Sequence, residues 1–421
     1  MYKNRRTRLA AGAVVLALVA VGLNASAAQA EDIPGWFTPN ARNSSDPSIM
    51  PCTYRNNGQS PVETLCMYTS SDMATRGYTP DNYYPMSETY LYMLKPGSGI
   101  DPGIQSNWYD EGVMFKESWY PWVKPRDAQT DANHLWAPTA ARGRDGNYYL
   151  YVPDISGTTT TEVHTESHIG VSMSIDPRGP FNYQKQLTYN GLGVAGYASD
   201  PTVMSTVHAP ISTASTTWIA WANGDYETCG NFSVARLDDI DMSTLLTAPR
   251  ELAVVELPAG MDTCTRSGGF HGTVSHAYME GPELYDVTGL GLPGPFMLLF
   301  AIKPNSNPSG CSSSNEAIAY ATGTDPLLPF TYRGIVMCGS TTQWTNQASL
   351  HAYRDSGSAH YLVAYHDAPT SGVIPQNRHA HIGCLPMFAG AGPLLTRANN
   401  FSSCMGTRGG QYNWKEMIYL R

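Results

Sequence analysis

Three acidic residues of this chain begin short segments of similar composition, each with a proline one or two positions later. The segments are Asp46-Pro-Ser-Ile, Asp200-Pro-Thr-Val and Glu280-Gly-Pro-Glu. Only 14% of the residues are charged, and like charges held close together are costly. A site that uses several carboxyl groups for proton transfer therefore explains the pattern better than a structural role does.

The segments that begin with these acids belong to a repeat. Five apolar, aromatic-rich strands are expected, and a shorter strand precedes each of them. The aromatic strands contain Tyr68, Tyr151, Trp221, Phe300 and Tyr365, and the shorter strands begin at Asp46, Trp136, Asp200, Glu280 and Gln347. Helical periodicity is almost absent. The repeats predict an all-β fold, a five-bladed β-propeller that forms a single domain.

The first strand of each propeller blade lines the central channel, so its opening residue should face one funnel. Three of the five opening residues are carboxylic acids. Hydrolysis of a glycosidic bond with inversion needs one carboxylic acid that protonates the leaving oxygen and a carboxylate on the opposite face that activates water. A third acid can orient the first and raise its pKa by like-charge repulsion. The three acids suit this reaction.

The ordered set of motifs resembles glycoside hydrolase family 43. Besides the three acidic segments, the resemblance rests on Trp136-Ala-Pro, Trp108-Tyr-Asp-Glu-Gly-Val and Ile169-Gly-Val-Ser-Met-Ser-Ile-Asp-Pro-Arg-Gly-Pro-Phe181, and it covers residues 40–390. It implies a five-bladed propeller and an inverting enzyme that acts on arabinose- or xylose-containing glycans.

The resemblance also implies a role for four residues. Asp46 matches the general base and Glu280 the general acid, while Asp200 matches the residue that tunes and orients this acid. Trp136 would form part of the wall of the sugar-binding pocket, although a place in the propeller core explains a tryptophan equally well.

Two positions depart from the family pattern. Thr139 follows Trp136-Ala-Pro, where many members have aspartate, and Gln347 begins the fifth blade, where many members have a histidine linked to a central metal ion or water cluster. A glutamine carbonyl can bind a hard cation, but glutamine is a less basic ligand than imidazole. A central structural calcium therefore stays an open alternative, and the chemistry itself requires no cofactor.

The resemblance implies a plant cell-wall polysaccharide or oligosaccharide as the substrate. The long connections contain many aromatic residues, including Trp108, Trp119, Tyr120, Trp122 and Trp344. The run Trp119-Tyr-Pro-Trp122 precedes the inner strand of the second blade, so it could stand at the mouth of the funnel and stack on sugar rings, although a structural cap explains it equally well. A walled funnel favours an exo-acting α-L-arabinofuranosidase or β-xylosidase. An endo-arabinanase of the same family and a catalytically silent carbohydrate-binding propeller are the alternatives.

Residues 1–30 have the pattern of a secretory signal peptide. A basic patch precedes an apolar stretch from Leu9 to Leu23, and the small-residue cleavage signal Ala28-Gln-Ala30 follows. We expect the mature protein to comprise residues 31–421, to be secreted and extracellular, and to be a monomer. Loss of the four basic residues of the leader changes the formal net charge from −9 to −13. Such an acidic chain without a basic tract is a poor partner for nucleic acid or a membrane.

All eight cysteines lie after residue 30. An even number in an exported protein predicts four disulfides and no free thiol. The pair Cys52–Cys66 is favoured, because the two cysteines lie on consecutive strand-like segments. In the chain-entropy model, closing a loop of that size contributes about 3 kcal/mol.

Overall fold

A computed structural model describes most of the strands of this protein. The described residues are 31–32, 43–56, 59–72, 86, 88–97, 102, 104–116, 119, 135–156, 166–194, 198–204, 216–223, 231–257, 263–266, 274–277, 279–288, 292–303, 316–337, 343–355, 358–369, 378–386 and 417–418. The predicted signal peptide, residues 1–30, lies outside them. Within these ranges, no helix is long and apolar enough to cross a membrane.

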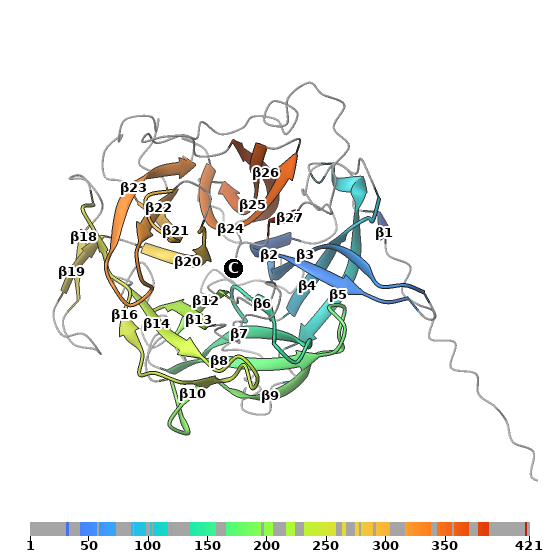
Figure 1. The fold of residues 1–421 in the computed structure, drawn as a ribbon, viewed down its shortest axis with the longest axis horizontal. Coiled ribbons are helices and arrows are strands. Elements are labelled where there is room, and N and C mark those ends of the chain that lie inside the picture. Colours follow the sequence, from blue (N-terminus) through green and yellow to red (C-terminus); the bar gives the residue numbers. More distant parts are fainter. Residues whose placement is uncertain are drawn as a thin grey trace, which may run out of the picture.

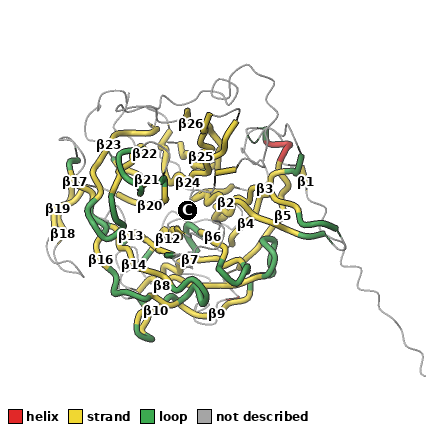
Figure 2. Tube along the Cα trace, viewed as in Figure 1, coloured by secondary structure: helices red, strands yellow, loops and turns green. Residues whose placement is uncertain are grey.

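The described chain is almost entirely β-structure, as the alternating aromatic and Gly/Pro-rich segments predict (Figure 2). Its one helical element is the short 3-10 helix η1 (Gln105–Asn107). The first sheet has the strand order β1-β5-β4-β3-β2 and is antiparallel throughout. Its strands are β1 (Glu31–Asp32), β2 (Asn43–Tyr54), β3 (Val62–Asp72), β4 (Glu88–Leu94) and β5 (Trp108–Lys116).

The next two sheets follow in chain order. The second has the order β6-β7-β8-β9, and the third has the order β11-β10-β15-β14-β13-β12 with β16 beside β14. The strands of the second sheet are β6 (Thr139–Arg142), β7 (Tyr148–Ser156), β8 (Glu166–Ser174) and β9 (Asn182–Gln186). Those of the third are β10 (Thr188–Tyr189), β11 (Leu192–Gly193), β12 (Ser199–Met204), β13 (Thr217–Ala222), β14 (Phe232–Leu237), β15 (Thr244–Leu245) and β16 (Arg250–Glu251).

Two further large sheets and one hairpin complete the described strands. The orders of the large sheets are β17-β23-β22-β21-β20 and β26-β25-β24-β27. The first of them contains β17 (Val254–Val255), β20 (Met279–Asp286), β21 (Phe296–Ile302), β22 (Ala317–Gly323) and β23 (Phe330–Met337). The second contains β24 (Gln343–Asp355), β25 (Ser358–Pro369), β26 (His379–Pro386) and β27 (Met417–Ile418). The hairpin consists of β18 (Thr263–Arg266) and β19 (Val274–Ala277).

Five inner strands, one from each large sheet, contact one another in a closed cycle. The cycle runs β2, β6, β12, β20, β24 and back to β2. These strands surround the centre of the view in Figure 1, and the other strands of each sheet lie farther out. Each inner strand pairs antiparallel with the next strand in the chain, and that second strand is the aromatic strand of the repeat. The all-β, propeller-like arrangement is therefore confirmed.

The hydrophobic core is divided among the contacts between neighbouring sheets. Among the described residues it forms clusters that each join two neighbours, and one cluster joins the first sheet to the last through Leu65 of β3 and Leu362 of β25. The repeated aromatic residues Tyr68, Tyr151 and Trp221 are at most 1% exposed. Aromatic side chains of this size dominate the burial energy, so the repeat specifies how the sheets pack.

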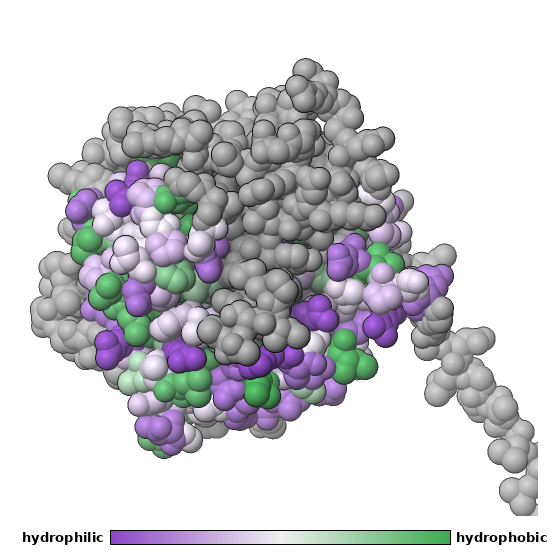
Figure 3. All heavy atoms as spheres, viewed as in Figure 1, coloured by the Kyte–Doolittle hydropathy of each residue, from purple (hydrophilic) through white to green (hydrophobic). Residues whose placement is uncertain are grey.

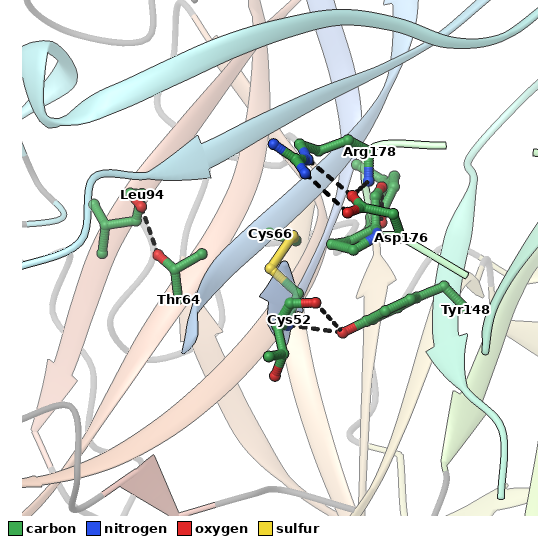
Figure 4. Close-up of a disulfide and its surroundings, with 10 residues drawn as sticks. Cys52, Thr64, Cys66, Leu94, Tyr148, Asp176 and Arg178 are labelled. Carbon is green, nitrogen blue, oxygen red and sulfur yellow. Dashed lines mark hydrogen bonds and ion pairs between the residues drawn. A yellow bond between two sulfur atoms is a disulfide. The ribbon is translucent and has the colours of Figure 1, made fainter. Parts of the chain in front are cut away.

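The predicted pair Cys52–Cys66 is confirmed as a disulfide (Figure 4). It joins β2 to β3, which are adjacent antiparallel strands. Close by, the Tyr148 hydroxyl of β7 bonds the backbone of Thr53, which ties the first sheet to the second. The side chains of the other six cysteines lie outside the described residues.

Exposed apolar side chains are scattered over the described surface. The most exposed of them are Ile175, Leu192 and Ile240. Ile175 and Ile240 lie on two different connections, and Leu192 lies on the short strand β11. On the face shown in Figure 3, hydrophobic residues (green) lie among hydrophilic residues (purple). Single exposed apolar residues are normal on soluble proteins, so this pattern does not indicate a docking surface.

Candidate active site

A shared backbone irregularity aims side chains of the inner strands into the site. Four of the inner strands contain a β-bulge, in which the inner strand has one residue more than its partner. At the bulge, the backbone φ angle is positive at Asp46 (51°), Asp200 (47°), Gly281 (57°) and Gln347 (43°), and Ala137 of the segment before β6 has the same feature (36°). Bulges bend a strand and re-aim its side chains. The repeated bulge therefore explains why acids on different sheets meet.

The structure corrects the expected equivalence of the five opening residues. Asp46, Asp200 and Gln347 occupy the positive-φ position, but Gly281 occupies it in β20, so Glu280 lies one residue earlier. Trp136 is displaced in the same way relative to Ala137. A Cβ at Gly281 would lie 3.2 Å from Cγ of Gln347, so the glycine lets β20 approach β24 closely. The acid of this strand consequently comes from the preceding position.

Asp46 lies in a buried cluster with positive and polar groups. It is 3% exposed, and Nη1 of Arg378 lies 3.1 Å from its Oδ1. The backbone N–H of Asp46 donates to Nδ1 of His366 (3.0 Å), which is also 3.2 Å from Oδ1. The Ser45 hydroxyl donates to Oδ2 (3.1 Å). These contacts fix the orientation of the carboxylate.

The surroundings of Asp46 keep it ionised. Burial by itself would raise the pKa of its carboxyl, but the Arg378 guanidinium and the adjacent His366 imidazole outweigh burial and hold this pKa well below its usual range. Asp46 is therefore a carboxylate throughout the pH range in which proteins usually work. A carboxylate that is ionised before the reaction is ready to accept a proton from water during it.

Asp200 has the opposite protonation behaviour. Burial and the neighbouring charges of Glu280 and Asp46 raise its pKa to about 8, against hydrogen bonds from the Gly281 N–H (3.2 Å) and the Gln347 side chain. The charge of Glu280 is the larger of the two neighbouring charges that raise this pKa, so the two carboxyl groups lie close together. Asp200, and with it the pair of Asp200 and Glu280, therefore holds a proton at neutral pH. The three predicted acids are thus brought together at one site.

Glu280 contacts an amide that links it to a fourth acid. The Asn346 side-chain N–H group of β24 donates to Oε1 of Glu280, and it also donates to Oε2 of Glu316 at 2.9 Å. Glu316 immediately precedes β22 and is 8% exposed. The site therefore contains more carboxyl groups than the repeated motifs indicate.

Glu283 lies deeper on β20 and joins three inner strands. Its Oε2 accepts hydrogen bonds from the Thr202 hydroxyl of β12 (2.8 Å) and from the Tyr285 hydroxyl (3.2 Å), and the Tyr285 oxygen accepts the Leu350 N–H of β24 (2.7 Å). Burial raises the pKa of Glu283 to about 8, with the Asp200 charge adding to it and the hydrogen bonds opposing it. Glu283 is therefore neutral at neutral pH.

The raised pKa of Glu283 predicts how stability depends on pH. A carboxyl with a folded-state pKa above its unfolded value of about 4.3 contributes stability that is lost as pH rises towards the folded value. Between pH 5 and pH 8, the free energy of unfolding should fall in the wild type, and it should fall less in Glu283→Gln, by about 1–3 kcal/mol. Urea unfolding at a series of pH values measures the two slopes.

A matched control separates this effect from a general loss of charge. Glu63 is exposed on β3, so Glu63→Gln should leave the pH dependence unchanged. The pKa of Asp200 is raised as well. Because Asp200 is present in all three proteins, its contribution to the pH dependence cancels when they are compared. Equal slopes for the wild type and Glu283→Gln would contradict the prediction.

The predicted aromatic residues have different surroundings. Trp136 is half-buried and immediately precedes Ala137, the positive-φ residue of its segment. Trp119 is 40% exposed and packs edge-on against Phe115 of β5. Trp108 is wholly buried and donates its indole N–H to the Pro102 carbonyl (2.8 Å), so it presents no face to a sugar. Tyr120, Trp122 and the side chain of Trp344 lie outside the described residues.

The described channel does not match the donor set of a calcium ion. Calcium takes six to eight oxygen ligands, several of them carboxylate oxygens. The Gln347 side chain is engaged by Asp200. A cavity of about 50 Å³ among the inner strands is lined by apolar and hydroxyl-bearing residues, Arg142 and His351, and by only one carboxyl, that of Glu283. The described residues contain no group of three or more His, Cys, Asp and Glu side chains that could hold a metal. Hydrolysis by paired carboxyl groups requires no metal.

Four residues of the site are absent from the sequence-based prediction, namely His366, Arg378, Asn346 and Glu316. His366, Arg378 and Glu316 belong to no recurrent motif, and they approach the acids through tertiary contacts. Asn346 does carry a signal, because it precedes Gln347 at the place that corresponds to Glu280 before Gly281. Alignment of the repeats on their bulges would have identified it.

The site combines one permanently ionised carboxylate with a carboxyl pair that retains a proton. Carboxyl groups with such different protonation states can serve as acid and base partners. Hydrolysis of a glycosidic bond requires such a pair of carboxyl groups. The family model described as glycosyl hydrolases family 43 matches residues 97–387. The chain belongs to this family, and the protein is a glycosidase.

Solved structures support the fold. CoXyl43, a GH43 β-xylosidase/α-arabinofuranosidase from a compost microbial metagenome, was solved with xylotriose in a calcium-free form. It is 19% identical, with a TM-score of 0.54 over 87% of this chain and 98% of that chain. The GH43_1 enzyme from Xanthomonas citri with xylose is 19% identical, with a TM-score of 0.52 over 87% and 93%. A comparison with curated proteins found no match.

Proposed function

We propose that this protein is a secreted, inverting glycosidase that releases pentose units from arabinose- or xylose-containing plant cell-wall polysaccharides and oligosaccharides. The observation that supports this most directly is the opposed protonation of the two halves of the site. Asp46 is held ionised by Arg378, whereas the pair of Asp200 and Glu280 retains a proton. A single step of inverting hydrolysis uses an ionised base and a protonated acid together.

In the proposed reaction, Asp46 removes a proton from a water molecule as the water oxygen bonds to the anomeric carbon. The bond between that carbon and the leaving oxygen breaks, and Glu280 delivers its proton to the leaving oxygen. Asp200 shares the proton of the pair and keeps Glu280 in its acid form before the reaction. Trp136, which is half-buried, would form part of the wall against which the sugar packs.

The substrate class follows from the similar enzymes. CoXyl43 is a β-xylosidase/α-arabinofuranosidase, and the Xanthomonas citri enzyme binds xylose and xylotriose. We propose an exo-acting α-L-arabinofuranosidase or β-xylosidase, a monomer whose five large sheets are five blades of one propeller. Export rests on the leader pattern of residues 1–30.

Proton NMR of the first-formed products tests this proposal. The purified mature protein is incubated with arabinan, arabinoxylan, xylan and their oligomers, and the reaction is followed from its first minutes. We expect single arabinose or xylose units whose anomeric configuration is opposite to that of the substrate, because an inverting site places water and leaving group on opposite faces.

The other outcomes discriminate between the alternatives. A retained anomer would refute the inverting assignment of Asp46 and Glu280. A ladder of long oligosaccharides from linear arabinan, with little monosaccharide, would show an endo-arabinanase. Binding to these glycans without turnover, also on aryl pentosides with acidic leaving groups, would show a catalytically silent carbohydrate-binding propeller.

A further inference from the structure

Asn346 holds its side-chain amide in one orientation. The backbone N–H of Gln347 donates to Oδ1 of Asn346 at 2.5 Å, so the amide oxygen faces the backbone and the NH₂ group faces the acids. Asn346 is 6% exposed. Its orientation therefore follows from a backbone contact and not from a choice between two similar atoms.

The two amide hydrogens have separate acceptors on two different elements. One acceptor is Oε1 of Glu280 on β20, and the other is Oε2 of Glu316, which immediately precedes β22. Placing a second buried carboxyl this close to Glu280 is unfavourable unless the arrangement has a use. Here Glu316 accepts one hydrogen of the Asn346 amide, and this contact directs the other hydrogen towards Glu280.

The contact also favours one oxygen of Glu280 as the carrier of a proton. The carbonyl oxygen of a protonated carboxyl is a better acceptor than its hydroxyl oxygen, so the N–H donated to Oε1 favours a hydrogen on Oε2. Transfer of a proton requires that the donor oxygen already points at the acceptor. An amide that fixes Oε1 therefore also fixes the direction of Oε2.

We propose that Asn346 and Glu316 are positioning residues for the acid catalyst: Asn346 binds Oε1 of Glu280 so that Oε2 delivers the proton, and Glu316 holds the Asn346 amide in place. This inference rests on the proposed role of Glu280 as the general acid. It assigns neither Asn346 nor Glu316 a contact with the substrate.

The test is a leaving-group series measured with Asn346→Ala and Glu316→Ala, because alanine removes the acceptor oxygen that glutamine would retain. kcat and KM are determined on aryl pentosides whose leaving groups span a wide range of acidity, and on a xylo- or arabino-oligosaccharide. Asn346→Ala should lower kcat on the oligosaccharide by about 10- to 100-fold, since general acid catalysis contributes about 10²- to 10⁴-fold and misalignment removes part of it. On the most acidic leaving group, which needs little protonation, kcat should stay within about threefold.

Glu316→Ala should change kcat in the same direction by a smaller factor, with KM little changed in both variants. A matched control is Asn147→Ala, which removes an exposed amide that donates to the Asp145 carboxylate in the turn between β6 and β7. Any loss in this control should be equal for all leaving groups. Thermal unfolding establishes that each variant is folded, and Glu316→Ala carries the test if Asn346→Ala does not fold.

Glu280→Ala separates this inference from the proposed function. It should show the steepest dependence on leaving-group acidity of all the variants. If Glu280→Ala shows that dependence but Asn346→Ala and Glu316→Ala lose activity equally on all leaving groups, the positioning inference is overturned and the general acid stands. If Glu280→Ala itself lacks the dependence, the proposed role of Glu280 fails.

Discussion

Replacing Asp46 by asparagine should lower kcat on xylo- or arabino-oligosaccharides by at least about 10³-fold. Asparagine has nearly the same shape as aspartate but cannot take a proton from water. The Asp46 carboxylate is buried, oriented by Arg378 and His366, and kept ionised by them. The substitution therefore removes the base from this position. Steady-state kinetics on the natural oligosaccharide measure the loss.

A second Asp-Pro dipeptide of the chain provides the control for this variant. Asp325 precedes Pro326 in a turn, where its carboxyl accepts the Leu327 N–H (2.8 Å), and an asparagine oxygen can accept the same hydrogen bond. Asp325→Asn should therefore keep wild-type turnover. Folded Asp46→Asn with near-wild-type kcat would remove Asp46 from the mechanism. Recovery of turnover of Asp46→Asn with azide on an aryl pentoside would show that only the activation of water was lost.

Replacing Arg378 by methionine should destabilise the protein by about 3–5 kcal/mol. Removal of one partner from a buried ion pair leaves the other charge without compensation, and Arg378 and Asp46 are 10% and 3% exposed as side chains. Urea unfolding at neutral pH measures the change. The Arg178–Asp176 pair, with side chains that are 27% and 23% exposed, provides the control, because Arg178→Met should cost much less, as partly exposed pairs do.

The same variant should change the pH dependence of catalysis. Because Arg378 lowers the pKa of Asp46, its removal raises that pKa, and the acidic limb of kcat/KM should move to higher pH. A stability loss without any movement of the acidic limb would show that Arg378 supports the fold alone. An unchanged stability would contradict the ion pair itself.

Much of the fold is determined by local patterns that a single sequence displays. The alternation of short and aromatic strands predicts the antiparallel pairs β2–β3, β12–β13 and β20–β21, because apolar, β-branched and aromatic runs between turn residues form strands wherever they pack. Cys52 and Cys66 lie on such neighbouring strands, so their disulfide was predictable as well. Asp46 and Asp200 were identifiable because each carries the same motif at the same place in its repeat.

The position of Glu280 shows the limit of this reasoning. Its motif matches those of Asp46 and Asp200 only approximately, and alignment by residue type places it one position too late. The structure aligns the strands by their bulges and puts Gly281 at the positive-φ position. The reason is steric, since the positive φ at Gly281 and the close approach of β20 to Gln347 leave little room for a side chain there.

The sequence by itself thus determined the class of fold, three acids and the chemistry that three acids can perform. The tertiary structure alone decided which acid is ionised and which pair keeps a proton, because that depends on groups far away in the chain. Arg378 and His366 are 332 and 320 residues from Asp46 in sequence. They reach it because the closed ring of inner strands places the last sheet against the first. No local pattern encodes that contact, since it arises only when the ring closes.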